Sequence, residues 1–229
     1  MNKTPPIELE FSRKYDKQHS QHYLRKHRAN FARRLSHWRD VQVGRQALKM
    51  AGEPDLVLDL PCGAGRFWPM LAEHKSRVII AADNSAAMLS VAQAAQPAEV
   101  VKRVRTLRTS AFAIDLADNA VDSIFCIRLL HHIESSDNRL TILREFHRVS
   151  RDTVIVSLWV DGNFKAWKRK RLEQSRKDAG RGGENRFLVT RDVIEQEFRQ
   201  AGFSIIGHKD FLPGYAMWRT YVLRKNTAL

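Results

Sequence analysis

The eleven residues VLDLPCGAGRF, from Val57 to Phe67, decide the fold of this chain. A short apolar run, typical of a buried strand, leads into an acidic residue, a proline and two glycines. Gly63 and Gly65 follow that strand and precede a helical pattern. We therefore expect a tight turn at which a ligand approaches the backbone and the N-terminus of a helix.

Outward from this stretch, strand patterns alternate with helical ones. Predicted strands are LVLDL (56–60), RVIIAAD (77–83), one within 100–110, AVDSIFCIRLLHHI (120–133), DTVIVSLWV (152–160) and two around LPG (212–214). Predicted helices are 65–75, 85–95, 135–150 and 190–202. This alternation predicts an α/β fold, a Rossmann-like, doubly wound, mostly parallel sheet with helices on both faces.

Ligands of such sheets bind at the carboxyl ends of the strands. Asp59, Asp83, Ser110 and Arg128 all fall at predicted strand ends of that kind. We therefore expect them at one edge of the sheet.

The residues around the turn select the ligand. The third glycine of a dinucleotide-binding G-x-G-x-x-G is absent because Trp68 occupies its position, and no G-x-x-x-x-G-K-[ST] phosphate loop is present. Asp59 would repel a pyrophosphate but suits an ammonium group, and Asp83 is placed to accept hydrogen bonds from two ribose hydroxyls. A ligand with a ribose, no phosphate and a cationic amino-acid end is S-adenosylmethionine.

With these residues in order, the chain resembles a class I S-adenosylmethionine-dependent methyltransferase of the small-molecule, type-11-like group. The resemblance runs from Asp55 to about Val160, through the acidic glycine loop, AADNSAAML, SAFAIDLADNAVDSI (110–124) and LHHI (130–133). It implies a seven-stranded sheet whose last strand is antiparallel, with S-adenosylmethionine as the cofactor. The implied cofactor-binding residues are Asp59, Pro61, Gly63, Gly65, Arg66, Asp83, Asn84, Met88, Ser110, Ala111, Phe112, Ile127 and Arg128.

Two positions depart from the family pattern. Pro61 replaces the first glycine of the loop and removes one backbone N–H. Ser110 stands where the family often has an aspartate that hydrogen-bonds the adenine amino group. The Ser110 hydroxyl or the neighbouring backbone is expected to serve instead, with Phe112 against the ring.

The catalytic candidates are His131 and His132, which follow the strand whose end should border the transferred methyl group. A histidine titrates close to neutral pH and suits a general base, which the reaction needs only when the acceptor loses a proton. The alternative interpretation is a polar strand end without a catalytic role. Trp159 and Arg186 are the candidate substrate-binding residues, and the sequence contains no metal-ligand cluster.

Positive charge is concentrated in particular segments of the chain. The formal net charge is +14, and residues 1–50 carry 12 Lys and Arg against four Asp and Glu. We predict a basic helical N-terminal arm at 1–50 (with HYLRKHRANFARR as helix) and a methyltransferase domain at 51–229. Within that domain, 161–190 is expected to be a basic insertion and possible substrate lid, flexible at Gly180, Gly182 and Gly183.

The basic arm and insertion predict an acidic partner. An acidic small-molecule or lipid-linked acceptor is preferred. RNA methylation and a non-catalytic cofactor-fold binding protein are the alternatives, since Lys and Arg also suit phosphates but no RNA-binding motif is present. No signal peptide or membrane-length apolar run is visible, and Cys62 and Cys126 lack metal-site spacing. A reduced, cytoplasmic protein is expected.

Overall fold

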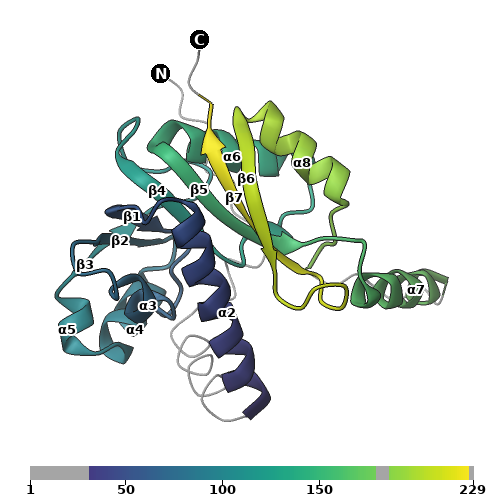
Figure 1. Ribbon diagram of the computed structural model, residues 1–229, viewed down its shortest axis with the longest axis horizontal. Helices are drawn as coiled ribbons and strands as arrows, with labels where there is room; N and C mark the ends of the chain where they lie inside the picture. The colour runs from purple at the N-terminus through teal and green to yellow at the C-terminus, as the bar shows by residue number, and fades with distance from the viewer. Residues whose placement is uncertain (1–30, 179–185, 227–229) are drawn as a thin grey trace.

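A computed structural model describes residues 31–178 and 186–226 (Figure 1). The predicted helix at 22–34 lies mostly, and Gly180, Gly182 and Gly183 lie wholly, outside these residues. The elements in chain order are α2 (Phe31–Met50), β1 (Leu56–Asp59), α3 (Trp68–Leu71), β2 (Val78–Asp83), α4 (Ala86–Ala95), α5 (Ala98–Val101), β3 (Val104–Arg108), β4 (Val121–Cys126), the 3₁₀ turn η2 (Leu130–His132), α6 (Ser136–Val149), β5 (Ser150–Trp159), α7 (Phe164–Asp178), α8 (Arg191–Gln200), β6 (Phe203–Asp210) and β7 (Trp218–Lys225).

The strands form one seven-stranded sheet in the order β3-β2-β1-β4-β5-β7-β6. Pairings from β3 to β5 are parallel, whereas β7 runs antiparallel to both β5 and β6. The chain starts at the centre with β1 and moves outward to β3 before it returns to β4, so the order reverses between β1 and β4. The predicted fold class, including the antiparallel last strand, is confirmed.

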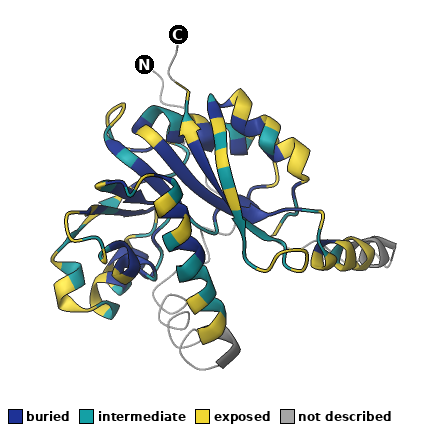
Figure 2. Cartoon of the chain, viewed as in Figure 1, coloured by how far each residue is buried: buried dark blue, intermediate teal, exposed yellow. Residues whose placement is uncertain are grey.

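Alternate residues of each central strand enter two different cores. Ile124 of β4 and Val154 of β5 belong to the core that α6 and α8 cover, while Phe125 and Ile155 belong to the core beneath α2 and α3. This period-two alternation follows from strand geometry and requires helices on both faces of the sheet. The strand centres are buried, and the side chains of α7 that the structure describes, at 164–172, are mostly exposed (Figure 2).

The second half of α2 is part of the second core. Ala47 and Leu48 are buried there against strand residues, and the Arg39 guanidinium donates to the carbonyls of Asp210 and Phe211 at 3.1 and 2.7 Å. The first helix of the described chain is therefore fixed to the last hairpin. The division into an arm and a domain at residue 50 stays a prediction.

Two predicted elements differ in length from those observed. The helix expected over 65–75 is only the four residues of α3, because Arg77 and Arg103 donate to the carbonyls of Leu71 and His74 and replace further helical bonds. The strand expected over 120–133 ends at Cys126, since Arg128 has a left-handed backbone with φ of 67°. None of the described helices has the length and apolar character that a membrane crossing requires.

Candidate functional site

Asp59 and Asp83 end the neighbouring parallel strands β1 and β2, and both are buried. The Asp83 carboxylate accepts the backbone N–H of Gly63 at 3.0 Å through Oδ2 and that of Ser85 at 2.9 Å through Oδ1. Asp83 thus fixes the glycine turn and the start of α4, where the Ser85 hydroxyl accepts the N–H of Met88. One carboxylate therefore joins the glycine turn to the start of α4, and both segments carry predicted cofactor-binding residues.

Asp59 is the buried group of this site whose charge is least compensated. Burial raises its pKa well above the usual value, and the Asp83 carboxylate raises it further. The Trp68 indole and the more distant Arg66 act in the opposite direction. Even so, neither Asp59 Oδ2 nor Trp68 Nε1 completes a hydrogen bond with a group of the described residues. A cationic ligand group beside Asp59 would restore its ordinary ionisation.

The two loop glycines have different roles. Gly63 has φ of 53°, and a Cβ built there meets no atom within 4 Å, so the space beside its backbone is open. A Cβ at Gly65 would lie 2.8 Å from the Trp68 ring. Gly63 therefore fits the expected ligand approach, while Gly65 is needed for packing. Pro61 precedes the turn through a cis peptide bond.

The adenine-side candidates form a tight turn after β3. The Ser110 hydroxyl accepts the N–H of Phe112 at 3.2 Å, and the N–H of Thr109 donates to the carbonyl of Asp83 at 3.1 Å. Ala111 and Phe112 pack partly buried against the core beneath α6. The Ser110 turn is thus bonded directly to the end of β2, with Asn84 exposed beside it.

Asp40, which was not among the predicted site residues, joins two of them. Asp40 of α2 accepts from Arg66 at 2.6 Å and from Arg128 at 2.7 Å, both through Oδ2. These partners come from the glycine loop and the end of β4. Asp40 is the only acidic residue of α2, and this lone carboxylate in a basic helix is the signal that could have found it.

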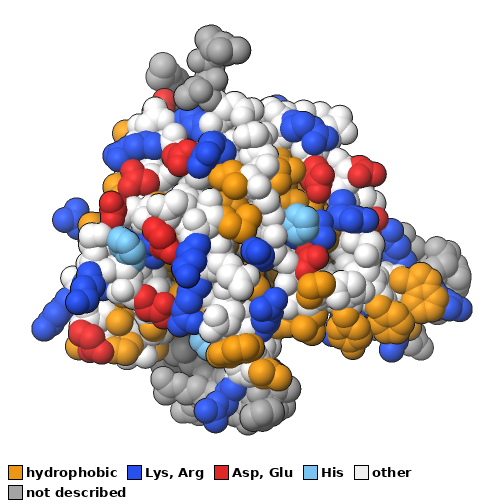
Figure 3. Space-filling model, in the orientation of Figure 1, with side chains coloured by type: hydrophobic (Ala, Val, Ile, Leu, Met, Phe, Trp, Pro, Cys, Tyr) orange, Lys and Arg blue, Asp and Glu red, His pale blue; other side chains and the backbone are white. Residues whose placement is uncertain are grey.

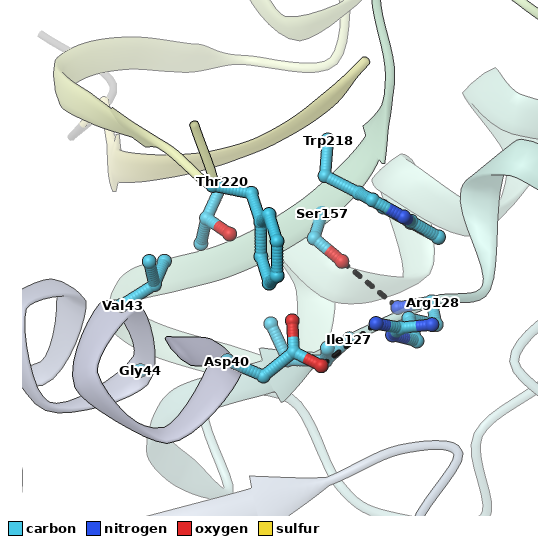
Figure 4. A pocket seen from close by; sticks show the side chains of 9 residues that line it. Asp40, Val43, Gly44, Ile127, Arg128, Ser157, Trp218 and Thr220 are labelled. Atoms are coloured by element: carbon cyan, nitrogen blue, oxygen red, sulfur yellow. Dashed lines mark hydrogen bonds and ion pairs between the residues drawn. The ribbon is translucent and has the colours of Figure 1, made fainter. Parts of the chain in front are cut away.

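Asp40 also lines a small pocket between α2, the segment that follows β4, β5 and β7 (Figure 4). Ile127 forms part of its wall, and the backbone N–H of Arg128 donates to the Ser157 hydroxyl at 2.9 Å. The Arg128 guanidinium lies 4.5 Å from the ring centre of Trp218. Arg66, Ile127 and Arg128 are therefore held by α2 and β7 as well as by the strands that precede them.

The histidine candidates lie in an aromatic cluster. His131 is 3% exposed, and its ring centre is 3.9 Å from that of His132, 5.3 Å from Trp159 and 4.7 Å from Trp218. Burial lowers the pKa of His131 to about 2, and the positive charges of Arg186 and Arg128 add to the effect. Its Nδ1 has no hydrogen-bond partner in the part of the chain that the structure describes. His131 is therefore neutral at any ordinary pH.

Two arginines from beyond β5 cover the same cluster. The guanidinium carbons of Arg169 and Arg186 lie 4.8 and 5.8 Å from the ring centre of Trp159. Arg169 donates to the carbonyl of Arg186, and the N–H of Phe187 donates to the carbonyl of His131 at 2.7 Å. The structure brings Trp159 and Arg186 together with His131, and Arg169 and Trp218 join them as residues that sequence reasoning had not assigned to the site.

Metal and thiol chemistry find no support in the described residues. Cys62 and Cys126 are free and buried, and burial raises the pKa of both thiols. Within residues 31–178 and 186–226, no three side chains of His, Cys, Asp and Glu gather as metal ligands do.

Comparison with known proteins identifies the central segment. Residues 57–153 match the family described as "Methyltransferase domain". That segment runs from β1 into β5 and contains the glycine turn, Asp83 and the two histidines. No curated protein sequence matches the chain.

Solved structures share the fold at low identity. Magnesium protoporphyrin IX methyltransferase from Synechocystis PCC 6803, with bound SAH, has a TM-score of 0.69 and 17% identity over 86% of this chain and 88% of its own. An S-adenosylmethionine (SAM)-dependent methyltransferase from Methanosarcina mazei has a TM-score of 0.61 and 16% identity over 76% and 93%. A chain of a Haloferax volcanii complex that contains the Trm112 methyltransferase activator has a TM-score of 0.63 and 12% identity over 97% of this chain and 100% of its own. These likenesses show a shared fold.

Proposed function

We propose that this chain, which belongs to the class I S-adenosylmethionine-dependent methyltransferases, transfers a methyl group to an acidic small-molecule or lipid-linked acceptor. Its cofactor is S-adenosylmethionine, whose sulfonium supplies an activated methyl group when bound. The observation that carries the acceptor class is the pair of guanidinium groups, from Arg169 and Arg186, stacked on Trp159 beside His131.

The residues at the ends of β1 and β2 fit the cofactor. The unpartnered Asp59 Oδ2 would accept from the ammonium group of its amino-acid end, and the open backbone at Gly63 leaves room for that end. The Asp83 carboxylate, which already accepts the N–H groups of Gly63 and Ser85, would also accept from a ribose hydroxyl. Phe112 and the Ser110 turn would border the adenine.

The arginine pair supports an anionic acceptor. Arg186 is exposed, and Arg169 is half-buried beside Trp159. A carboxylate or phosphate near Trp159 would meet two guanidinium groups whose planar donors bind such oxygens in pairs. A flat indole beneath them would carry the apolar body of the acceptor.

The two histidines take different parts in this proposal. His131 is held neutral by burial and contacts Trp159 and Trp218, so it orients the acceptor wall rather than moving a proton. His132 is less buried and lies against His131. It is the better candidate for a base when the accepting atom carries a proton, because a base with a pKa near 2 removes protons poorly at neutral pH.

Calorimetric titration with S-adenosylmethionine tests the cofactor site. We expect one site in the unchanged chain, and affinity at least tenfold lower in Asp59→Ala and in Asp83→Ala. Arg105→Ala, on the exposed edge strand β3, is the control and should bind normally. If both aspartate variants bind S-adenosylmethionine as the unchanged chain does, the cofactor does not bind at the ends of β1 and β2. That result would favour the non-catalytic binding protein.

A transfer assay with methyl-labelled cofactor tests the acceptor. Carboxylated and phosphorylated metabolites, a lipid extract and total RNA are offered separately. Label in a metabolite or lipid, lost in Arg186→Ala while cofactor affinity stays unchanged, supports the proposal. RNA methylation is the second candidate, favoured by the net charge of +14. Label in RNA alone, with transfer falling steeply as salt is raised, would overturn the proposed acceptor class.

A further inference from the structure

An exposed apolar surface lies on α7 and on the loop between β6 and β7. We call it the α7 patch. Its members are Phe164, Trp167 and Leu172 of the helix, and Leu212 and Tyr215 of the loop, with exposed fractions between 45% and 55%. Figure 3 shows hydrophobic side chains in a row along this edge of the molecule, with Lys and Arg beside them. A contiguous exposed group of large apolar residues marks an interaction surface.

The rings of the α7 patch are held in place. Phe164 stacks on Tyr215 with ring centres 5.8 Å apart and an interplanar angle of 11°, and it lies 5.9 Å from Trp167. The backbone N–H groups of Phe164 and Lys165 donate to the carbonyls of Gly214 and Tyr215 at 2.9 and 3.0 Å. Because α7 and the loop are joined by these bonds, the aromatic surface is a fixed part of the structure.

The helix presents this surface outward by its periodicity. Phe164, Trp167, Lys168, Arg171 and Leu172 occupy positions i, i+3, i+4, i+7 and i+8, which share one helical face. All five are exposed. The outward face of α7 therefore combines large apolar side chains with two cations.

The opposite face of α7 turns toward the protein. Ala166 is buried there, and Arg169 stacks on Trp159 of the site. The outward face thus lies on the same helix as a wall of the candidate site.

The charge of α7 selects the partner. Residues 164–172, FKAWKRKRL, contain five cations and no carboxylate. Lys165 lies 5.2 Å from the ring centre of Tyr215, and Arg171 lies 4.9 Å from that of Trp167. Trp, Tyr and Phe rings with flanking Lys and Arg suit the boundary between lipid headgroups and acyl chains, where anionic lipids attract the cations.

From this arrangement we propose that the α7 patch binds the surface of a membrane that contains anionic lipids. Leu172 and Leu212 favour a lipid surface over a nucleic acid, because aliphatic side chains bury in acyl chains but do not stack on bases. The α7 patch then lies in the headgroup region while Arg169 and Trp159 stay on the protein side. This inference goes beyond the proposed function and does not depend on the identity of the methyl acceptor.

Vesicle co-sedimentation of the full chain tests the inference without any methyl transfer. Vesicles of phosphatidylcholine alone are compared with vesicles that contain one-third phosphatidylglycerol. We expect binding to the anionic vesicles, at least tenfold weaker in Phe164→Ala/Trp167→Ala. Lys168→Glu/Arg171→Glu should weaken it roughly 25-fold or more, at about fivefold for each cation removed. Cofactor titration and circular dichroism confirm that each variant is folded.

Matched controls lie elsewhere on the surface. Lys102→Glu/Arg105→Glu reverses two exposed cations at the opposite end of the sheet, and Val193→Ala trims an exposed apolar residue of α8. Both should bind as the unchanged chain does.

Any one of five results would overturn the inference. The first is no binding to either kind of vesicle, and the second is unaltered binding of the aromatic variant. The third is a charge control that loses as much binding as Lys168→Glu/Arg171→Glu does. The fourth is the absence of vesicle binding together with light scattering that shows a dimer, which Phe164→Ala/Trp167→Ala dissociates. Binding of RNA through the α7 patch, without vesicle binding, would also overturn it.

Discussion

Replacing Asp40 with alanine should destabilise the protein far more than breaking an ordinary surface ion pair. The carboxylate is shared by two guanidinium groups, at 2.6 Å from Arg66 and 2.7 Å from Arg128. The exposed fractions of the three side chains are 11% for Asp40, 16% for Arg66 and 30% for Arg128. The substitution therefore removes the carboxylate that two partly buried cations share.

The expected loss follows from these contacts. A hydrogen bond to a charged group contributes about 1.5–3 kcal/mol, and the exposure of Arg128 places its bond at the low end or below. We expect Asp40→Ala to lower the free energy of unfolding by about 2–4 kcal/mol. Asp40→Asn keeps one acceptor oxygen but no charge, and its loss should be intermediate.

Urea unfolding followed by tryptophan fluorescence measures this loss, and α2 supplies a matched control. Arg45, one turn further along the helix, forms an equally short pair with Glu73, but the two side chains are 39% and 48% exposed. Solvent screening limits such a pair to about 1 kcal/mol or less, so Glu73→Ala should change stability little. Equal losses in Asp40→Ala and Glu73→Ala, within about 0.5 kcal/mol, would refute the reasoning.

Three further perturbations have defined outcomes. The midpoint of thermal unfolding should be lower for Gly65→Ala than for Gly63→Ala. Both positions have a left-handed backbone, but the methyl group added at Gly65 clashes with the Trp68 indole, whereas the one added at Gly63 meets open space. Glu197→Ala should cost about 3–5 kcal/mol in urea unfolding, because it leaves the buried Arg139 without its bidentate partner. His131, with its pKa lowered to about 2, stays neutral in the folded chain while the unfolded chain takes up a proton as pH falls below about 6.5. Stability should therefore fall by up to about 1.4 kcal/mol per pH unit below that point, and His131→Gln should make the measured slope shallower.

The fold was predictable because its signals are local. Periodicity and capping residues indicate a strand such as β1 and a capped helix such as α6, which starts after Ser135. The shortening of α3 was not predictable, because it depends on Arg77 and Arg103, which reach its carbonyls from other elements.

The candidate site likewise contains residues that were predictable from local sequence and residues that were not. Asp59, Asp83 and Gly63 stand at strand ends that the sequence reveals, so their meeting could be anticipated. The meeting of Asp40 with Arg128 joins residues 88 positions apart and depends on how α2 crosses the sheet. No pattern within either segment encodes that crossing.

The order of the sheet has a consequence for how the chain is made. β6 is synthesised before β7, yet β7 lies between β5 and β6 and pairs with both. β6 therefore has no neighbouring strand until β7 has paired with it. Until then the carbonyls of Asp210 and Phe211, which later hold Arg39, belong to an unfinished hairpin. The segment from β1 to β5 can pair before β7 is in the sheet. The bonds of Arg39 in α2 to the β6–β7 hairpin form only after β7 has paired with β5 and β6.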